Sequence, residues 1–195
     1  MSEATDCLDV ACGDYPQGTC NVDLFVGDTN QRHEGPVHLV LTPNFVRAEA
    51  CHLPFKTGTF ETVRCSHAIE HLDDPVALIR EMARVSKHHI VIICPFKYGV
   101  NANMSPLSKL HRPSVHKNTF DASWFEQVFK KLGLIRARVS YSAYRHIPNR
   151  WLALFVLPEE ITAKAQVTRA ETAVKVEPTV APDLFTQVIC PELED

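Results

Sequence analysis

The sequence lacks several features that define whole classes of protein. No apolar run in its 195 residues approaches the roughly 18 residues that a membrane-spanning helix needs. The first residues, MSEATDCLDVACG, have neither the basic flank nor the apolar stretch of a secretory signal, so we expect none. The seven cysteines include no C-x-x-C pair, which argues against zinc and iron–sulfur motifs. An odd set of cysteines without a secretion signal predicts reduced thiols and a cytoplasmic location.

The composition and the distribution of charge indicate how the chain is organised. A chain of this length predicts about one domain, and 45% hydrophobic with 22% charged residues is ordinary for a soluble globular protein. Ten Lys/Arg stand against two Asp/Glu in residues 97–150, whereas three stand against eight in residues 151–195. From Pro158 onward Ala, Thr, Glu, Val and Pro dominate. We therefore predict a core over 1–157 and an acidic appendage over 158–195, in part disordered.

The pattern of apolar residues predicts an α/β fold. Helical spacing appears over 74–85 and 123–132, and the apolar run within 89–94 is typical of a central parallel strand. Other segments that read as strands or extended chain are 7–10, 21–25 with its end at Asp23, 37–41, 44–47, 60–65, 134–142 and 150–157. The order predicts a Rossmann-like, mainly parallel sheet with helices on both faces, reduced at the N-terminus.

The ends of the first two strands carry the first candidate binding residues. Ligands of such sheets bind outside the carboxyl ends of the strands. Gly13 follows the first strand and Asp23 ends the second, although each residue alone is equally compatible with a plain turn. Only nine residues separate them, too few for a crossover helix, so we expect a loop or a single turn there.

A specific series of motifs occupies residues 49–95. It consists of Glu49-Ala50, Leu53-Pro54-Phe55, Phe60-Glu61-Thr62-Val63, Glu70-His71, Asp74-Pro75, Glu81, Arg84-Val85 and Pro95. In order and spacing this series resembles the middle of the class I S-adenosylmethionine-dependent methyltransferases, in the subgroup called methyltransferase type 11. The resemblance covers roughly residues 7–157. It implies S-adenosylmethionine as the cofactor and methyl transfer as the reaction.

The resemblance also implies which residues bind the cofactor. The loop of the first motif would hold the methionine end, and acids at later strand ends would bind the ribose and the adenine amino group. In this order the implied residues are Asp9, Ala11 and Gly13 for the loop, Asp23 for the ribose, Glu49 with Ala50 for the adenine, and Ser66 with His67 near the methionine part and the acceptor. The family usually has two or three glycines where this chain has Gly13 alone.

Methyl transfer from a sulfonium requires little of the protein beyond alignment and desolvation. A general base is needed only if the acceptor loses a proton as it attacks. His67 is the candidate base by position, although a histidine that hydrogen-bonds the backbone explains it as well. The irregular segment after Pro95 supplies candidate acceptor-site residues, namely His111, Arg112, His116 and Lys117.

Several alternatives remain open from the sequence. The basic segment 97–150 is either a solvated surface or a site for a small-molecule, lipid-precursor or glycan-type acceptor with an anionic group. Nucleic acid is not favoured because no RNA-binding module is visible. We expect no metal, since His111 and His116 lack a third ligand of suitable spacing. The single glycine keeps a catalytically silent binding or scaffold protein as the alternative, while a nicotinamide site would need G-x-G-x-x-G opening a helix.

Overall fold

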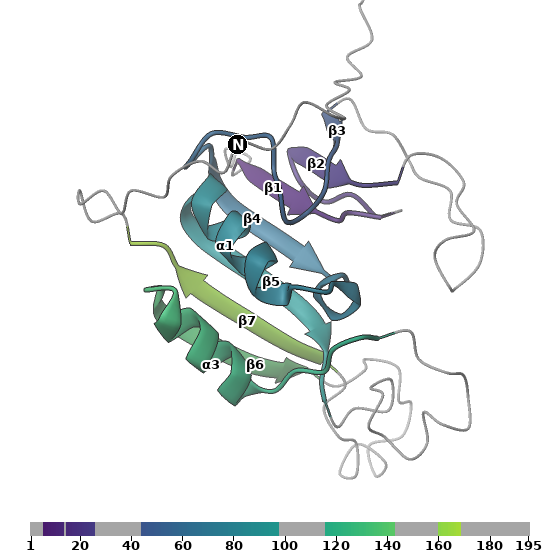
Figure 1. Ribbon diagram of the computed structural model, residues 1–195. Coiled ribbons are helices and arrows are strands. Elements are labelled where there is room, and N and C mark those ends of the chain that lie inside the picture. The colour runs from purple at the N-terminus through teal and green to yellow at the C-terminus, as the bar shows by residue number, and fades with distance from the viewer. Residues whose placement is uncertain (1–5, 14, 26–43, 98–115, 143–159, 169–195) are drawn as a thin grey trace, which may run out of the picture.

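A computed structural model describes residues 6–13, 15–25, 44–97, 116–142 and 160–168 (Figure 1). These residues form a seven-stranded sheet of order β3-β2-β1-β4-β5-β7-β6. The strands are β1 Cys7–Val10, β2 Cys20–Asp23, β3 Phe45–Arg47, β4 Phe60–Ser66, β5 Ser86–Pro95, β6 Ile135–Ser142 and β7 Glu160–Gln166. β7 runs antiparallel to both of its neighbours, and the other pairs of adjacent strands are parallel. The predicted α/β, mainly parallel sheet is confirmed.

Two helices begin at the acids that cap them. The carboxylate of Asp74 accepts the backbone N–H groups of Val76 and Ala77 at the start of α1, Pro75–Val85. Asp121 does the same for Trp124 at the start of α3, Ala122–Lys131. Side-chain acceptors at this position satisfy backbone N–H groups that have no partner within the helix. Both helices were predicted to within a residue or so at each end.

Both helices lie on one face of the sheet, in front of it in Figure 1. The connections β4–α1–β5 and β5–α3–β6 each join two parallel strands, and both move the same way across the sheet. Right-handed crossovers therefore place α1 and α3 on the same face. The alternating side chains that bury against them are Val63 and Cys65 of β4, Ile90, Ile92 and Cys94 of β5, and Ile161, Ala163 and Ala165 of β7. Helices on the other face remain a prediction that concerns residues outside the described ranges.

The position of β7 corrects the predicted domain boundary. Glu160–Gln166 falls within the predicted appendage 158–195, yet it lies between β5 and β6 and pairs with both. Ile161, Ala163 and Ala165 alternate with polar residues, and their side chains are buried in the core. Every second residue is small or apolar, which is the strand period. The rest of the predicted appendage lies outside the described residues, and so do the predicted strands over 37–41 and 150–157.

The connection between β1 and β2 contains no helix among its described residues, 11–13 and 15–19. The expected loop is therefore confirmed. None of the helices in the described part of the chain is both long enough and apolar enough to cross a membrane.

Candidate cofactor and acceptor site

The predicted cofactor residues meet along one edge of the sheet. β3, β2, β1 and β4 are adjacent and parallel, so their carboxyl ends lie side by side in that order. Hydrogen bonds join the ends of β1, β2 and β3, and strand pairing places the end of β4 next to that of β1. The N–H of Gly13 donates to Oδ2 of Asp23 at 2.9 Å, and the N–H of Ala48 donates to the carbonyl oxygen of Asp23 at 3.1 Å. The structure thus brings together four segments that are far apart in the sequence.

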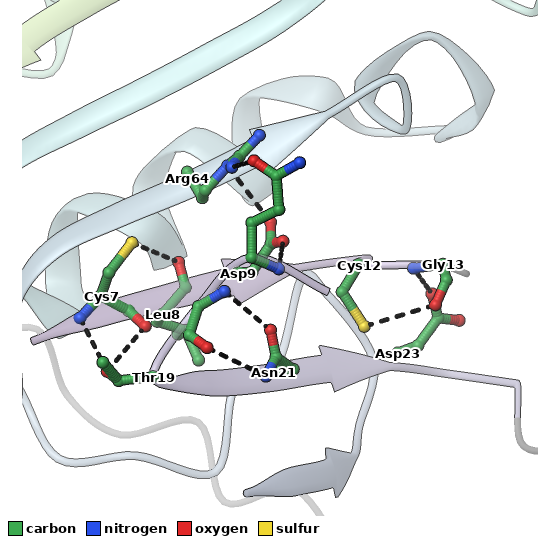
Figure 2. Close-up of polar contacts among 11 residues, drawn as sticks. Cys7, Leu8, Asp9, Cys12, Gly13, Thr19, Asn21, Asp23 and Arg64 are labelled. Atoms are coloured by element: carbon green, nitrogen blue, oxygen red, sulfur yellow. Dashed lines mark hydrogen bonds and ion pairs between the residues drawn. The ribbon is translucent and has the colours of Figure 1, made fainter. Parts of the chain in front are cut away.

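A compact loop replaces the helix that would normally connect β1 to β2. The N–H of Gln17 donates to Oδ2 of Asp9, and the N–H of Gly18 donates to Oδ1 of Asn21, both at 2.9 Å (Figure 2). The Asn21 amide in turn donates to the carbonyl oxygen of Gly18 at 3.2 Å. The N–H of Thr19 donates to the carbonyl oxygen of Cys7 at 2.8 Å. Side chains of the strands therefore hold the loop directly against β1.

Glycine is required at position 18 because the loop approaches the strands so closely. A Cβ at Gly18 would lie 2.3 Å from the carbonyl oxygen of Cys20 and 2.7 Å from both the Asp9 nitrogen and the Cys7 oxygen. All three are backbone atoms, which cannot rotate away as a flexible side chain would. The glycine thus lets the chain fold back within the short space between β1 and β2.

Left-handed backbone occurs at two strand ends of this edge. Ala11 has a φ of 54°, Gly13 a φ of 60°, and His67 a φ of 53°. Glycine adopts this conformation freely, whereas a residue with a Cβ is strained in it. Ala11 therefore occupies a backbone position suited to glycine, and strained residues of this kind are often found at functional sites.

Asp9 is a buried carboxylate at the base of the loop. Asp9 is 2% exposed, and the Nε of Arg64 on β4 lies 3.5 Å from the Oδ1 of Asp9. Burial raises the pKa of the Asp9 carboxyl, against the opposing effects of the Gln17 N–H and the Arg64 guanidinium. Arg64 also donates to the side-chain oxygen of Gln17. Asp9 accordingly helps to hold the loop in place, and its predicted role toward the cofactor stays a proposal.

Asp23, the predicted ribose acid, is 3% exposed, and its carboxylate binds the surrounding backbone. Oδ2 accepts the Gly13 N–H and Oδ1 accepts the Phe25 N–H at 3.1 Å. Both carboxylate oxygens of Asp23 therefore accept a backbone N–H group. These hydrogen bonds give Asp23 a structural role in closing the loop. Its predicted role in binding the ribose stays a proposal.

Glu49, the predicted adenine acid, is exposed beyond the end of β3. Oε2 of Glu49 lies 3.3 Å from Nδ1 of His52, and both side chains are more than half exposed. Ala50 is half-buried and packs on the core. An exposed carboxylate next to an apolar surface suits an amino group on a flat ring, which is consistent with the role that the resemblance implies.

The end of β4 holds a cluster of histidines and acids. The His67 N–H donates to the carbonyl oxygen of Ile93 at 2.8 Å, and its Nε2 lies 3.2 Å from Oε1 of Glu160 on β7. Its Nδ1 lies 3.8 Å from Oε1 of Glu70, in the 3-10 helix η1, Ile69–His71. Ser66 is half-buried at the last position of β4. His67 therefore stands between two carboxylates, one on each side of its ring.

Of the predicted acceptor residues, the structure describes His116 and Lys117, and His111 and Arg112 lie outside the described ranges. The rings of His116 and His71 are 5.0 Å apart, edge to face, beside Glu70. Nζ of Lys117 lies 2.7 Å from Oδ1 of Asp73 in an exposed ion pair. Lys117 is thus already paired, and His116 lies beside η1, the 3-10 helix that follows β4.

Five residues of the site were not singled out from the sequence, namely Gln17, Gly18, Asn21, Arg64 and Glu160. A weak signal was present for Gly18, because it is a turn-forming residue in a connection that the sequence shows to be too short for a helix. Arg64 and Glu160 have no local signal. Their roles depend on strand pairing, which brings Arg64 beside Asp9 and places β7 next to β5.

This sheet order, with acids at the ends of β1 and β2 and after β3, defines the Rossmann-like fold of the class I S-adenosylmethionine-dependent methyltransferases. Residues 18–94, from the loop after β1 to the end of β5, match the model of a methyltransferase domain family, methyltransferase type 11. The resemblance seen in the sequence is therefore confirmed.

Solved structures of methyltransferases share the fold. A putative methyltransferase of Bacillus halodurans is 15% identical, with a TM-score of 0.54 over 85% of this chain and 93% of that one. Magnesium protoporphyrin IX methyltransferase of Synechocystis, solved with S-adenosylhomocysteine, is 14% identical, with a TM-score of 0.57 over 85% and 75%. Phosphoethanolamine N-methyltransferase 2 of Haemonchus contortus is 15% identical, with a TM-score of 0.58 over 87% and 50%. The predicted enzyme class, with S-adenosylmethionine as its cofactor, agrees with the domain match and the shared fold.

Proposed function

We propose that the protein transfers the methyl group of S-adenosylmethionine to a small-molecule, lipid-precursor or glycan-type acceptor that carries an anionic group. The cofactor would lie along the carboxyl ends of β3, β2, β1 and β4. Its adenine would meet Glu49 and Ala50, its ribose Asp23, and its methionine part the loop from Ala11 to Gly13. The acceptor would bind beyond Ser66 and His67. The predicted cytoplasmic location is kept as part of this proposal.

One observation carries the proposal, namely the spatial order of these segments. The sheet order and the bonds from Gly13 and Ala48 to Asp23 align Glu49, Asp23, Gly13 and His67 along a single edge. That is the order in which the resemblance assigns adenine, ribose, methionine and acceptor. Ligands of open parallel sheets bind at this edge.

The anionic group on the acceptor is the finer part of the proposal. It is supported by the excess of Lys and Arg over residues 97–150 and by the histidines beside β4. Arginine binds phosphate or carboxylate through two parallel hydrogen bonds. The Haemonchus enzyme was solved with phosphomonomethylethanolamine, a ligand whose name denotes a phosphate group. The pairing of Lys117 with Asp73 and of Lys97 with Asp121 shifts this expectation toward Arg112.

Calorimetry with S-adenosylmethionine, S-adenosylhomocysteine and NAD tests the cofactor. We expect the first two to bind and NAD not to bind. Glu49→Ala should weaken binding about three- to ten-fold, the loss of one modest hydrogen bond of about 1 kcal/mol. Glu126→Ala is the matched control, because Glu126 is an exposed glutamate of α3. This helix packs on β6 and β7, at the end of the sheet opposite to β3. Binding of NAD, with neither S-adenosylmethionine nor S-adenosylhomocysteine bound, would refute the assignment.

An acceptor screen separates an enzyme from a catalytically silent scaffold. Formation of S-adenosylhomocysteine would be measured with paired phosphorylated and unphosphorylated compounds, and repeated with Arg112→Ala and Lys117→Ala. We expect turnover to favour the anionic member of a pair and Arg112→Ala to reduce it more than Lys117→Ala. Turnover that favours neutral acceptors, with both variants at wild-type rates, contradicts the anionic acceptor. Cofactor binding without turnover of any compound favours the scaffold.

A further inference from the structure

The structure places two imidazoles and a carboxylate around one point at the end of β4. Glu70, His71 and His116 each offer a ligand atom, and these atoms all lie within 4.8 Å of one another. Nε2 of His71 is 3.9 Å from Oε1 of Glu70, and the His71 and His116 rings meet edge to face at 5.0 Å. We propose that these three residues bind a divalent transition-metal ion of the zinc type.

The backbone holds the ligand-bearing segments together before any metal binds. The carbonyl oxygen of Glu70 accepts the N–H groups of Lys117 at 2.8 Å and Asn118 at 3.0 Å. The Asn118 amide donates to the carbonyl oxygen of Leu72 at 2.6 Å, and the Lys117–Asp73 ion pair lies at the rim. The segment that begins at His116 is therefore fixed against η1. A preorganised ligand set of this kind lowers the ordering cost of binding an ion.

The three ligand residues differ in burial in a way that suits metal binding. Glu70 is 2% exposed, so its carboxylate is a fixed anchor, whereas His71 is exposed and His116 is half-buried. Tetrahedral zinc with bonds of about 2.0–2.1 Å needs ligand atoms roughly 3.3–3.5 Å apart. Rotation of the two imidazoles must therefore close the present spacing, and their exposure allows it.

The donor set indicates which class of ion binds. Imidazole ligands suit zinc, copper, iron and nickel, whereas magnesium and calcium prefer oxygen ligands throughout. Two histidines and one glutamate leave one position of a tetrahedral zinc ion open. His67, with its Nδ1 3.8 Å from the same Oε1 of Glu70, lies at the edge of this group. If the acceptor binds as proposed, the open position is available to an anionic oxygen of the acceptor, a role that rests on the proposed function.

The test measures metal binding alone, without cofactor or acceptor. The full chain would be stripped with a chelator, and binding of Zn²⁺ followed by calorimetry and binding of Co²⁺ by visible absorption. We expect one equivalent to bind, with His71→Ala and His116→Ala each at least a hundred-fold weaker. His88→Ala is the matched control, because His88 is an exposed histidine paired with Glu61 at the start of β5.

Cysteines require a control of their own, since the chain has several free thiols. Blocking the accessible thiols should leave the binding of one equivalent unchanged, and Co²⁺ should show nitrogen and oxygen ligation without thiolate charge transfer. Equal affinity in His71→Ala and His116→Ala, loss of binding on thiol blocking, or no binding at all in the wild type would each overturn the proposal. Cofactor binding measured on the same metal-free protein tests the methyltransferase function separately.

Discussion

Replacing Ala11 with glycine should stabilise the protein, although it removes a methyl group next to the candidate cofactor loop. Ala11 has a φ of 54°, where a Cβ costs about 1–2 kcal/mol. Glycine lacks that strain but loses about 0.5–1 kcal/mol more conformational free energy on folding. The net gain should be about 0.5–1 kcal/mol. In a chain of this size that corresponds to a rise in Tm of about 1–4 °C.

Denaturant and thermal unfolding of matched variants test this reasoning. Ala68 has a φ of −128°, an ordinary value for any residue, so Ala68→Gly should lower stability where Ala11→Gly raises it. Ala11→Val should be destabilising, because branching at Cβ makes left-handed backbone worse. The two glycine variants therefore differ in sign. If Ala11→Gly destabilises as much as Ala68→Gly does, the backbone at position 11 is not strained and the argument fails.

Three further perturbations follow from the geometry. Gly18→Ala should prevent stable folding or cost roughly 3 kcal/mol or more, because its Cβ would meet three backbone atoms at 2.3–2.7 Å. Gly133→Ala is the control in denaturant unfolding, because a Cβ there meets no atom within 4 Å and adds only the strain of a φ of 70°, so it should cost clearly less. A fragment of residues 1–157 lacks β7, so it should be insoluble or appear unfolded by circular dichroism, whereas a fragment of residues 1–168 should fold. A folded 1–157 fragment would contradict the central place of β7 in the sheet. Burial acts to raise the pKa of Glu81, but hydrogen bonds from Arg84 and the Leu53 N–H outweigh burial and lower the pKa. The ionised Glu81 therefore contributes its full stabilisation of the folded protein above a pH near 4.5, the ordinary value for glutamate. This contribution is lost as the pH falls through the pKa of Glu81 in the folded protein. Glu81→Gln should therefore cost about 1.5–3 kcal/mol at pH 7 and flatten the loss of stability in acid, and an unchanged acid profile would count against it.

Sequence patterns predicted the elements whose cause is local. Asp74, Pro75 and the apolar spacing after them define α1, and the apolar run within β5 predicted a strand with correct placement. The short spacing between Gly13 and Asp23 was enough to exclude a helix there. In each case the information lies within a dozen residues.

The parts that the sequence did not predict depend on contacts between distant segments. β7 was taken for part of an appendage because Ile161, Ala163 and Ala165 include two alanines, which give a weak apolar alternation. Arg64 beside Asp9 and Glu160 beside His67 arise only from strand pairing. The grouping of His71 with His116 likewise depends on the backbone hydrogen bonds that Lys117 and Asn118 donate to Glu70. No local pattern contains these facts.

The sheet order also constrains how the chain can acquire its structure during synthesis. β7 is the last of the described strands, yet it occupies the gap between β5 and β6, and its residue Gln166 pairs with His89, 77 positions earlier in the chain. Until β7 has been made, β6 has no described strand to pair with, and Phe125 and Phe129 of α3 lack part of the surface that buries them. Folding from the N-terminus must therefore pause at β5 and finish only after residue 166 is available. A nascent chain stalled before that point would leave part of the aromatic face of α3 uncovered.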